Sequence, residues 1–113
     1  MIKRLTPGEE EVMFIIWKAS EPLSTRDITN SKDRLNQNVV QSVVRRLLEK
    51  KFIKVCGIAH SGPSITRLYK PVIREVEYFS NVVPKDTLKK VVRHYLSKVN
   101  DEEELNDLKQ ILV

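Results

Sequence analysis

A cluster of polar side chains between Asn36 and Lys51, in NQNVVQSVVRRLLEKK, could carry out recognition chemistry. These side chains are amides, a hydroxyl and guanidinium groups, with no acid among them: Asn38, Gln41, Ser42, Arg45 and Arg46. Amides can form paired hydrogen bonds with base edges, and guanidinium groups can bind phosphates. The residue types therefore predict a surface that binds a nucleic-acid groove.

The same stretch has the hydrophobic period of one amphipathic helix. Apolar residues recur at intervals of three and four, and they fall on one face: Val40, Val43, Val44, Leu47 and Leu48. The polar residues occupy the other face. One side can therefore pack on a small core while the other meets a DNA groove, and we interpret the stretch as a recognition helix.

The charge distribution supports a polyanionic partner for the first part of the chain. The net charge is +5 over 113 residues. Residues 1–70 contain 13 lysines and arginines against 7 acidic residues, whereas residues 71–113 contain 7 against 8. The positive charge thus lies wholly in the part that holds the recognition helix. A basic surface that is merely solvated is the alternative explanation.

Two shorter helices are predicted before the recognition helix. Thr6 and Glu9 form a T-x-x-E capping box at the start of the first, and Ser24 and Asp27 form an S-x-x-D box at the start of the second. The polar segment 30–36 predicts a turn. Two helices, a turn and an amphipathic helix make a helix-turn-helix arrangement.

The first turn of the second helix is a candidate phosphate contact. Thr25 and Arg26 lie there, where free N–H groups and the positive end of the helix dipole suit an anion. Simple capping by Thr25 and a solvated Arg26 form the alternative.

A β-hairpin is predicted directly after the recognition helix. Phe52–Cys56 and Ser64–Lys70 are rich in strand-forming residues, and 57–63 predicts a loop between them. Pro71 ends the second strand. A hairpin in this place is a wing, and some of its side chains could reach a DNA backbone: Lys54, His60, Arg67 and Lys70.

The sequence offers no pattern for a metal, a cofactor or catalysis. Cys56 and His60 have C-x-x-x-H spacing, but a metal needs three or four ligands. We therefore expect a small buried thiol at Cys56. The two histidines lie far apart in sequence, neither has an adjacent acid or nucleophile pattern, and three glycines provide no phosphate loop. We predict that the chain is not an enzyme.

The expected compartment is the cytoplasm. A single cysteine excludes an internal disulfide framework and fits a reducing environment. We see no signal peptide and no apolar run long enough to span a bilayer, so no membrane association is expected.

The last 42 residues predict three amphipathic helices. Their apolar positions keep helical spacing: Val72, Ile73, Val76, Phe79, Val82 and Val83, then Leu88, Val91, Val92, Tyr95, Leu96 and Val99, then Leu105, Leu108, Ile111 and Leu112. Asn100 with Glu103 predicts the start of the last helix. Three such helices are too few to enclose a core, so a two-fold dimer would bury their stripes. Folding of the tail onto the first domain is the alternative.

These patterns together predict a mainly α protein of two parts. Residues 1–71 would form a winged helix-turn-helix domain with a two-stranded β-wing, and residues 72–113 a helical dimerisation domain.

Three segments resemble the penicillinase-repressor family. LTPGEEEVMFIIW is similar to its opening pattern, VVQSVVRRLLEKKFIKV to its recognition helix, and ELNDLKQIL to its acidic final helix. The resemblance implies a homodimeric repressor that binds a short inverted-repeat operator in double-stranded DNA. The positions that match the family's contacting residues are Asn38, Val39, Gln41, Ser42 and Arg46. Val39 and Gln41 depart from the threonine and arginine of the β-lactamase repressors, so the half-site should differ.

Two further departures concern the signal that releases the repressor. The copper-responsive members end in paired C-x-C motifs, which this chain does not contain. The antibiotic-responsive members are cut at an Asn-Phe bond, and His94-Tyr95 stands at the matching positions. The resemblance thus leaves open whether a sensor or protease partner exists.

Two other functions are compatible with the residues. The winged helix could be a protein-interaction module without sequence-specific DNA binding, with the tail as its docking surface. Alternatively, a small molecule could bind at the domain junction near Trp17, Tyr69 and Phe79.

Overall fold

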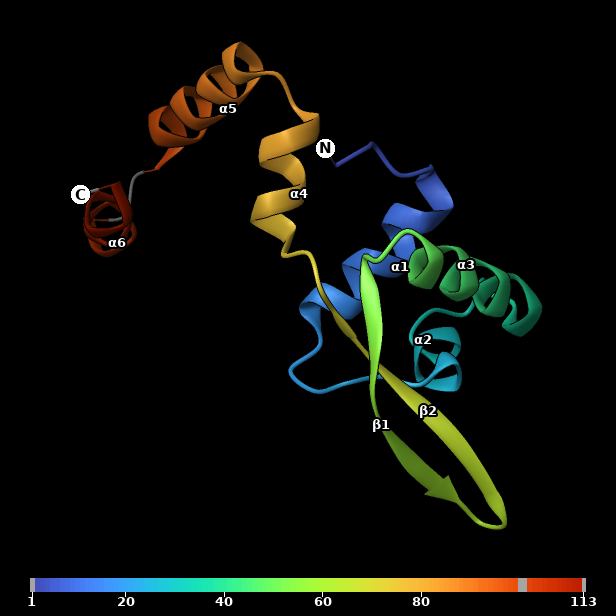
Figure 1. The fold of residues 1–113 in the computed structure, drawn as a ribbon. Helices are drawn as coiled ribbons and strands as arrows, with labels where there is room; N and C mark the ends of the chain where they lie inside the picture. Colours follow the sequence, from blue (N-terminus) through green and yellow to red (C-terminus); the bar gives the residue numbers. More distant parts are fainter. Residues whose placement is uncertain (1, 100–101, 113) are drawn as a thin grey trace.

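The computed structural model describes residues 2–99 and 102–112 of the chain. Helices precede and follow a two-stranded antiparallel sheet (Figure 1). The elements in order are α1 Pro7–Lys18, α2 Thr25–Asn30, α3 Gln37–Glu49, β1 Ile53–Ser61, β2 Ser64–Pro71, α4 Glu75–Val82, α5 Lys85–Lys98 and α6 Glu102–Leu112. This order confirms the predicted winged helix-turn-helix followed by a helical tail.

The core lies where α1, α2 and α3 meet. Both predicted capping boxes are present, since Thr6 Oγ1 accepts from Glu9 N at 3.3 Å and Ser24 Oγ accepts from Asp27 N at 3.1 Å. The apolar stripe of α3 faces inward, and four of its predicted members are buried: Val40, Val43, Val44 and Leu47. Burial of these side chains turns the polar face of α3 toward solvent, as its periodicity predicted.

The wing is longer than predicted. Residues 57–61 continue β1, and the register runs from Ile53↔Pro71 to Ser61↔Ser64, so the predicted loop at 57–63 is wrong. Only Gly62 and Pro63 form the turn, and Gly62 has the positive φ of 60° that the first position of a type II′ turn requires. Pairing with the strong strand formers of β2 outweighs the weak strand preference of Gly57 and Ala59.

Cys56 is exposed, and the expected burial of its thiol is wrong. A β-bulge between Val55 and Gly57 leaves Cys56 without a cross-strand partner in the register. Its Sγ donates to the Leu68 carbonyl at 3.6 Å. The wing consists of only two strands, so a residue at the bulge has no second layer to cover it.

Helix α4 packs against α1. The Tyr78 side chain is fully buried, and its hydroxyl donates to Glu10 at 2.6 Å and accepts from Leu5 N at 2.8 Å. Trp17 Nε1 donates to the Ile73 carbonyl at 2.8 Å, which fixes the segment before α4. The predicted stripe did not include Tyr78.

Two members of that predicted stripe are exposed. Val72 is 49% and Val76 is 73% exposed. Residues 72–74 are not helical, so the helical period applies only from Glu75 onward. A helical stripe that is counted from residue 72 therefore assigns its first members to the wrong face.

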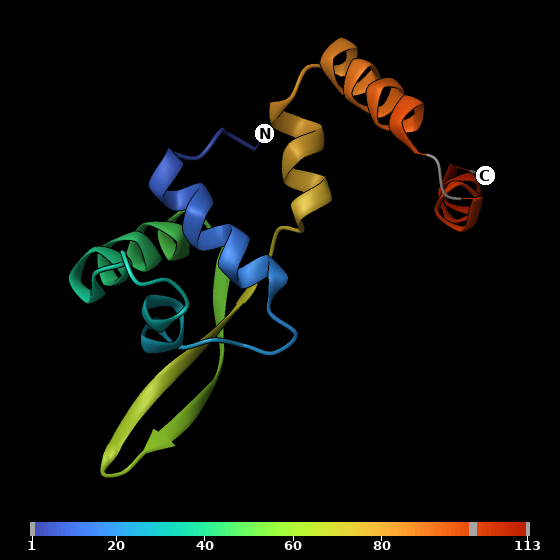
Figure 2. The same cartoon turned by 180° about the vertical axis from the view of Figure 1, so that it is seen from behind.

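Helices α5 and α6 extend away from the core, on the side opposite the wing tip (Figures 1 and 2). No residue of α5 is buried. Tyr95 of α5 donates to the Glu104 carboxylate of α6. The predicted helix start at Asn100 lies outside the described residues, and the domain boundary between 71 and 72 stays a prediction.

Candidate nucleic-acid interface

The N-terminal end of α3 is held by a cap that orients its first side chains. Asn36 Oδ1 accepts from Asn38 N at 2.8 Å and from Val39 N at 3.4 Å. The Asn36 side chain thus satisfies N–H groups that the helix leaves open. The cap therefore fixes where α3 begins, and with it the direction in which the side chains of its first turn point.

All the residues predicted to read DNA from α3 point to solvent: Asn38, Val39, Gln41, Ser42, Arg45 and Arg46. Val39 is 57% exposed, whereas four apolar residues of the same helix are buried. An exposed methyl-bearing side chain is able to contact the thymine methyl group of a major groove.

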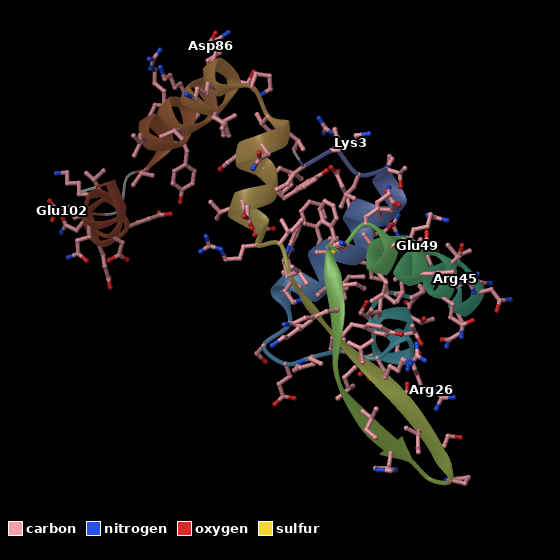
Figure 3. The ribbon with its side chains drawn as sticks, in the orientation of Figure 1. Lys3, Arg26, Arg45, Glu49, Asp86 and Glu102 are labelled. Carbon is pink, nitrogen blue, oxygen red and sulfur yellow. The ribbon has the colours of Figure 1, made fainter. Side chains whose placement is uncertain are left out.

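Two exposed arginines are available for phosphate. Arg26 at the start of α2 and Arg45 on α3 extend outward on the same side of the molecule (Figure 3). Neither forms an ion pair within the part of the chain that the structure describes. Because no carboxylate of the protein neutralises these two guanidinium groups, both can form ion pairs with the phosphates of a polyanion.

Arg46, in contrast, is already paired within the protein. Its Nε lies 3.3 Å from Glu9 Oε2, and its Nη1 donates to Ser42 Oγ at 3.2 Å. Lys50 Nζ lies 2.8 Å from Glu9 Oε1. The side chain of Arg46 remains 47% exposed, so its remaining N–H groups can still reach a ligand.

Glu9 is the centre of this ion-pair cluster, and its carboxylate is fully buried. Burial alone would raise the pKa of Glu9, but hydrogen bonds from Lys50 and the Thr6 N–H and the Lys50 charge lower it to about 2. The sequence pattern identified Glu9 only as a capping residue. Its second role depends on the crossing of α1 and α3, which no local pattern reveals.

A cleft of about 680 Å³ separates the wing from the two helices of the helix-turn-helix. Four predicted contact residues line it: Thr25, Arg26, Gln41 and His60. Gln37, Ser64 and Thr66 also line it, and the sequence pattern did not point to them. Because α2, α3 and both strands of the wing meet there, a backbone that entered the cleft would contact the helices and the wing together.

The other predicted wing residues lie outside this cleft. Arg67 pairs across the hairpin with Ile58, whereas its neighbour Thr66 lines the cleft. Arg67 is not among the residues that line the cleft, although Thr66 and Leu68 on either side of it are. Lys54 is exposed opposite Lys70, near the base of the wing.

The alternative small-molecule site at the domain junction is only partly assembled. Trp17 and Tyr69 line a cleft of about 230 Å³, which is smaller than most ligand sites. Phe79 does not line it and instead stacks on Phe14, with ring centroids 5.9 Å apart.

Neither a metal cluster nor a membrane-spanning helix is found in 2–99 and 102–112. No three His, Cys, Asp or Glu side chains there come together to hold a metal ion. No helix in these ranges is both long and apolar enough to cross a bilayer.

Three helices with an outward-facing polar helix and a following hairpin define a winged helix-turn-helix protein. The model of the family described as "Penicillinase repressor" matches residues 5–113. The chain belongs to this family, whose members are DNA-binding transcriptional repressors and not enzymes. The predicted family is thus confirmed.

A solved structure supports the same fold. The chain is similar to one described as the solution structure of the DNA binding domain of the repressor BlaI, with a TM-score of 0.51 and 25% identity. The match covers 69% of this chain and 94% of that one. A comparison with curated proteins gave no match.

Proposed function

We propose that the chain is a homodimeric repressor that binds an inverted-repeat operator through α3. The observation that carries this proposal is the exposed face of α3, which presents amides, a hydroxyl and Arg45 without an acid between Asn38 and Arg46. Each α3 would enter a major groove, as recognition helices do, with half-sites one turn or about 34 Å apart.

Base reading is assigned to the first turns of α3. Gln41 and Asn38 would pair with base edges, Val39 would touch a thymine methyl, and Ser42 would contact a base or sugar. Each paired amide contact contributes about 1–3 kcal/mol of discrimination against the wrong base. The similarity to the DNA binding domain of the repressor BlaI supports this use of the fold.

Phosphate contacts are assigned to the cations around this helix. Arg26 and Arg45 would bind backbone beside the groove, with Thr25 and His60 at the cleft and Lys54 and Arg67 on the wing. Arg46 would add a contact through the part of its guanidinium that Glu9 and Ser42 leave free. Counterion release by these groups would dominate affinity and make it strongly salt-dependent.

The tail would supply the dimer contact. Val91, Val92 and Tyr95 on α5 are 58%, 46% and 46% exposed, and they share a helical face. A protomer that leaves this face to water is expected to bury it against a second copy of itself.

Binding to random duplex across a salt series tests the proposal. Fluorescence anisotropy should show an affinity that falls steeply between 50 and 200 mM salt, by about a thousandfold if each dimer neutralises six or more phosphates. Weak binding at every salt concentration would reject it. Selection from a random duplex pool should then yield an inverted repeat.

One observation favours the alternative of a protein-interaction module. Ile58 and Ile65 on the wing are 56% and 64% exposed, and they would suit an apolar partner. An interaction module would show little DNA binding in the same salt series.

A further inference from the structure

A third pocket lies away from the proposed DNA interface, where the N-terminal segment meets the end of α3. Its volume is about 450 Å³, within the range of small-molecule sites. Its walls come from three parts of the chain: Ile2, Lys3, Arg4, Lys50, Phe52 and Ile73. None of these residues belongs to the set proposed to contact DNA.

The lining combines an apolar surface with cations. Phe52 is buried and Ile2 and Ile73 are partly buried, so they provide the apolar part. The other three lining residues are Lys3, Arg4 and Lys50, and no acidic residue lines the pocket. This division of chemistry suits a ligand with an apolar body and an anionic head.

The cations are not all neutralised by the protein. Arg4 Nε lies 3.7 Å from Glu10 Oε2 and is 67% exposed, and Lys50 is paired with Glu9. Lys3 has no ion-pair partner within residues 2–99 and 102–112. The mouth of the pocket therefore keeps a positive charge that an anion can compensate.

We propose that this pocket binds a small amphipathic carboxylate. The carboxylate head would accept hydrogen bonds from Lys3 and Lys50, and the apolar body would lie against Phe52 and Ile73. Charge-assisted hydrogen bonds at the mouth and burial of apolar surface below it would act together.

The pocket is connected to the recognition helix through Lys50. Lys50, which lines the pocket, and Arg46, which belongs to the proposed DNA interface, both bind the Glu9 carboxylate. A ligand that takes hydrogen bonds from Lys50 leaves Glu9 with Arg46 as its main partner. Arg46 is then held more firmly against the protein, and occupancy of the pocket should weaken DNA binding.

Titration of the 113-residue chain with octanoate, followed by ¹H–¹⁵N correlation spectra, tests the site without DNA. Saturable shifts are expected at the pocket's lining residues, whereas 1-octanol, which has the same body without the charge, should produce much weaker ones. Lys3→Gln should weaken octanoate binding about fivefold, as expected for an exposed ion pair. Lys18→Gln, at the other end of α1, is the matched control and should bind normally.

The outcomes separate the site from its coupling. Absence of saturable shifts, or equal binding of octanol, would overturn the anion site. Lys50→Gln should weaken octanoate binding further. If Lys50→Gln unfolds, Lys3→Gln still tests the site.

Octanoate should lower the affinity for DNA in wild type and not in Glu9→Gln. An unchanged affinity in wild type would overturn the coupling, and a protein that binds octanoate but no DNA would contradict only the proposed function.

Discussion

Replacement of Glu9 by glutamine tests whether the ion-pair cluster at the base of α3 stabilises the fold. Glutamine keeps the shape of the side chain and removes the charge that Lys50 and Arg46 compensate. The pKa of Glu9 falls from 4.5 to about 2, and one pKa unit corresponds to about 1.36 kcal/mol, so the charge contributes at most about 3 kcal/mol. Lys50 and Arg46 are about half exposed, and solvent around them reduces the expected loss to about 2 kcal/mol.

The pH dependence has a defined sign. A carboxyl group with a lowered pKa in the folded state contributes stability above its unfolded pKa and loses it as the pH falls through the folded value. The contribution of Glu9 should therefore be complete at pH 7, decline below about pH 4.5 and be nearly absent at pH 2. The difference between wild type and Glu9→Gln should shrink in the same window.

Urea unfolding followed by circular dichroism, at one protein concentration, measures the free energy of unfolding lost in Glu9→Gln. Repeating it between pH 7 and pH 2 measures how that loss depends on pH. Glu11→Gln is the matched control, because Glu11 lies on the same helix and pairs with Arg34, which is 72% exposed. That variant should lose less than about 1 kcal/mol. A Glu9→Gln protein as stable as wild type at pH 7, or a deficit that persists at pH 2, would refute the reasoning.

Three further predictions concern the tail and the interface. Tyr78→Phe should destabilise the chain by about 1–3 kcal/mol in urea unfolding, because the buried N–H of Leu5 loses its acceptor; an unchanged midpoint would contradict this. Val92→Asp should convert the dimer to a monomer in analytical ultracentrifugation, while Lys90→Asp, an exposed position on the opposite side of the same helix, should not; a dimer that survives Val92→Asp would place the contact elsewhere. Gln41→Ala should relax the preference at one base position in duplex selection, and an unaltered consensus would remove Gln41 from base reading.

Much of the helix-turn-helix could be predicted from local signals. Capping boxes at Thr6 and Ser24 and the apolar period of α3 are properties of short segments, and the structure places them as predicted. The wing was predicted less well, because Gly57 usually indicates a loop. A bulge and pairing with β2 depend on a partner strand, which a local pattern does not contain.

Contacts between distant segments were beyond the reach of the local patterns. Tyr78 was left out of the predicted stripe. Its hydroxyl accepts from the Leu5 N–H group, which lies 73 positions away in the sequence, so no local pattern indicates this contact. Glu9 and Lys50 form an ion pair although they are 41 positions apart in the sequence, and neither residue by itself indicates which partner it will have. Such pairs form only when helix crossings bring them together.

The sequence by itself determined which face of α3 is apolar and which can read DNA, because helical periodicity assigns every side chain to a face. It also determined the excess of positive charge in the first 70 residues. Only the tertiary structure decided that Arg46 is partly held by Glu9 while Arg26 and Arg45 stay available, since packing of α1 against α3 controls which cations are compensated. It also decided that Thr25, Gln41 and His60, from three separate elements, line one cleft.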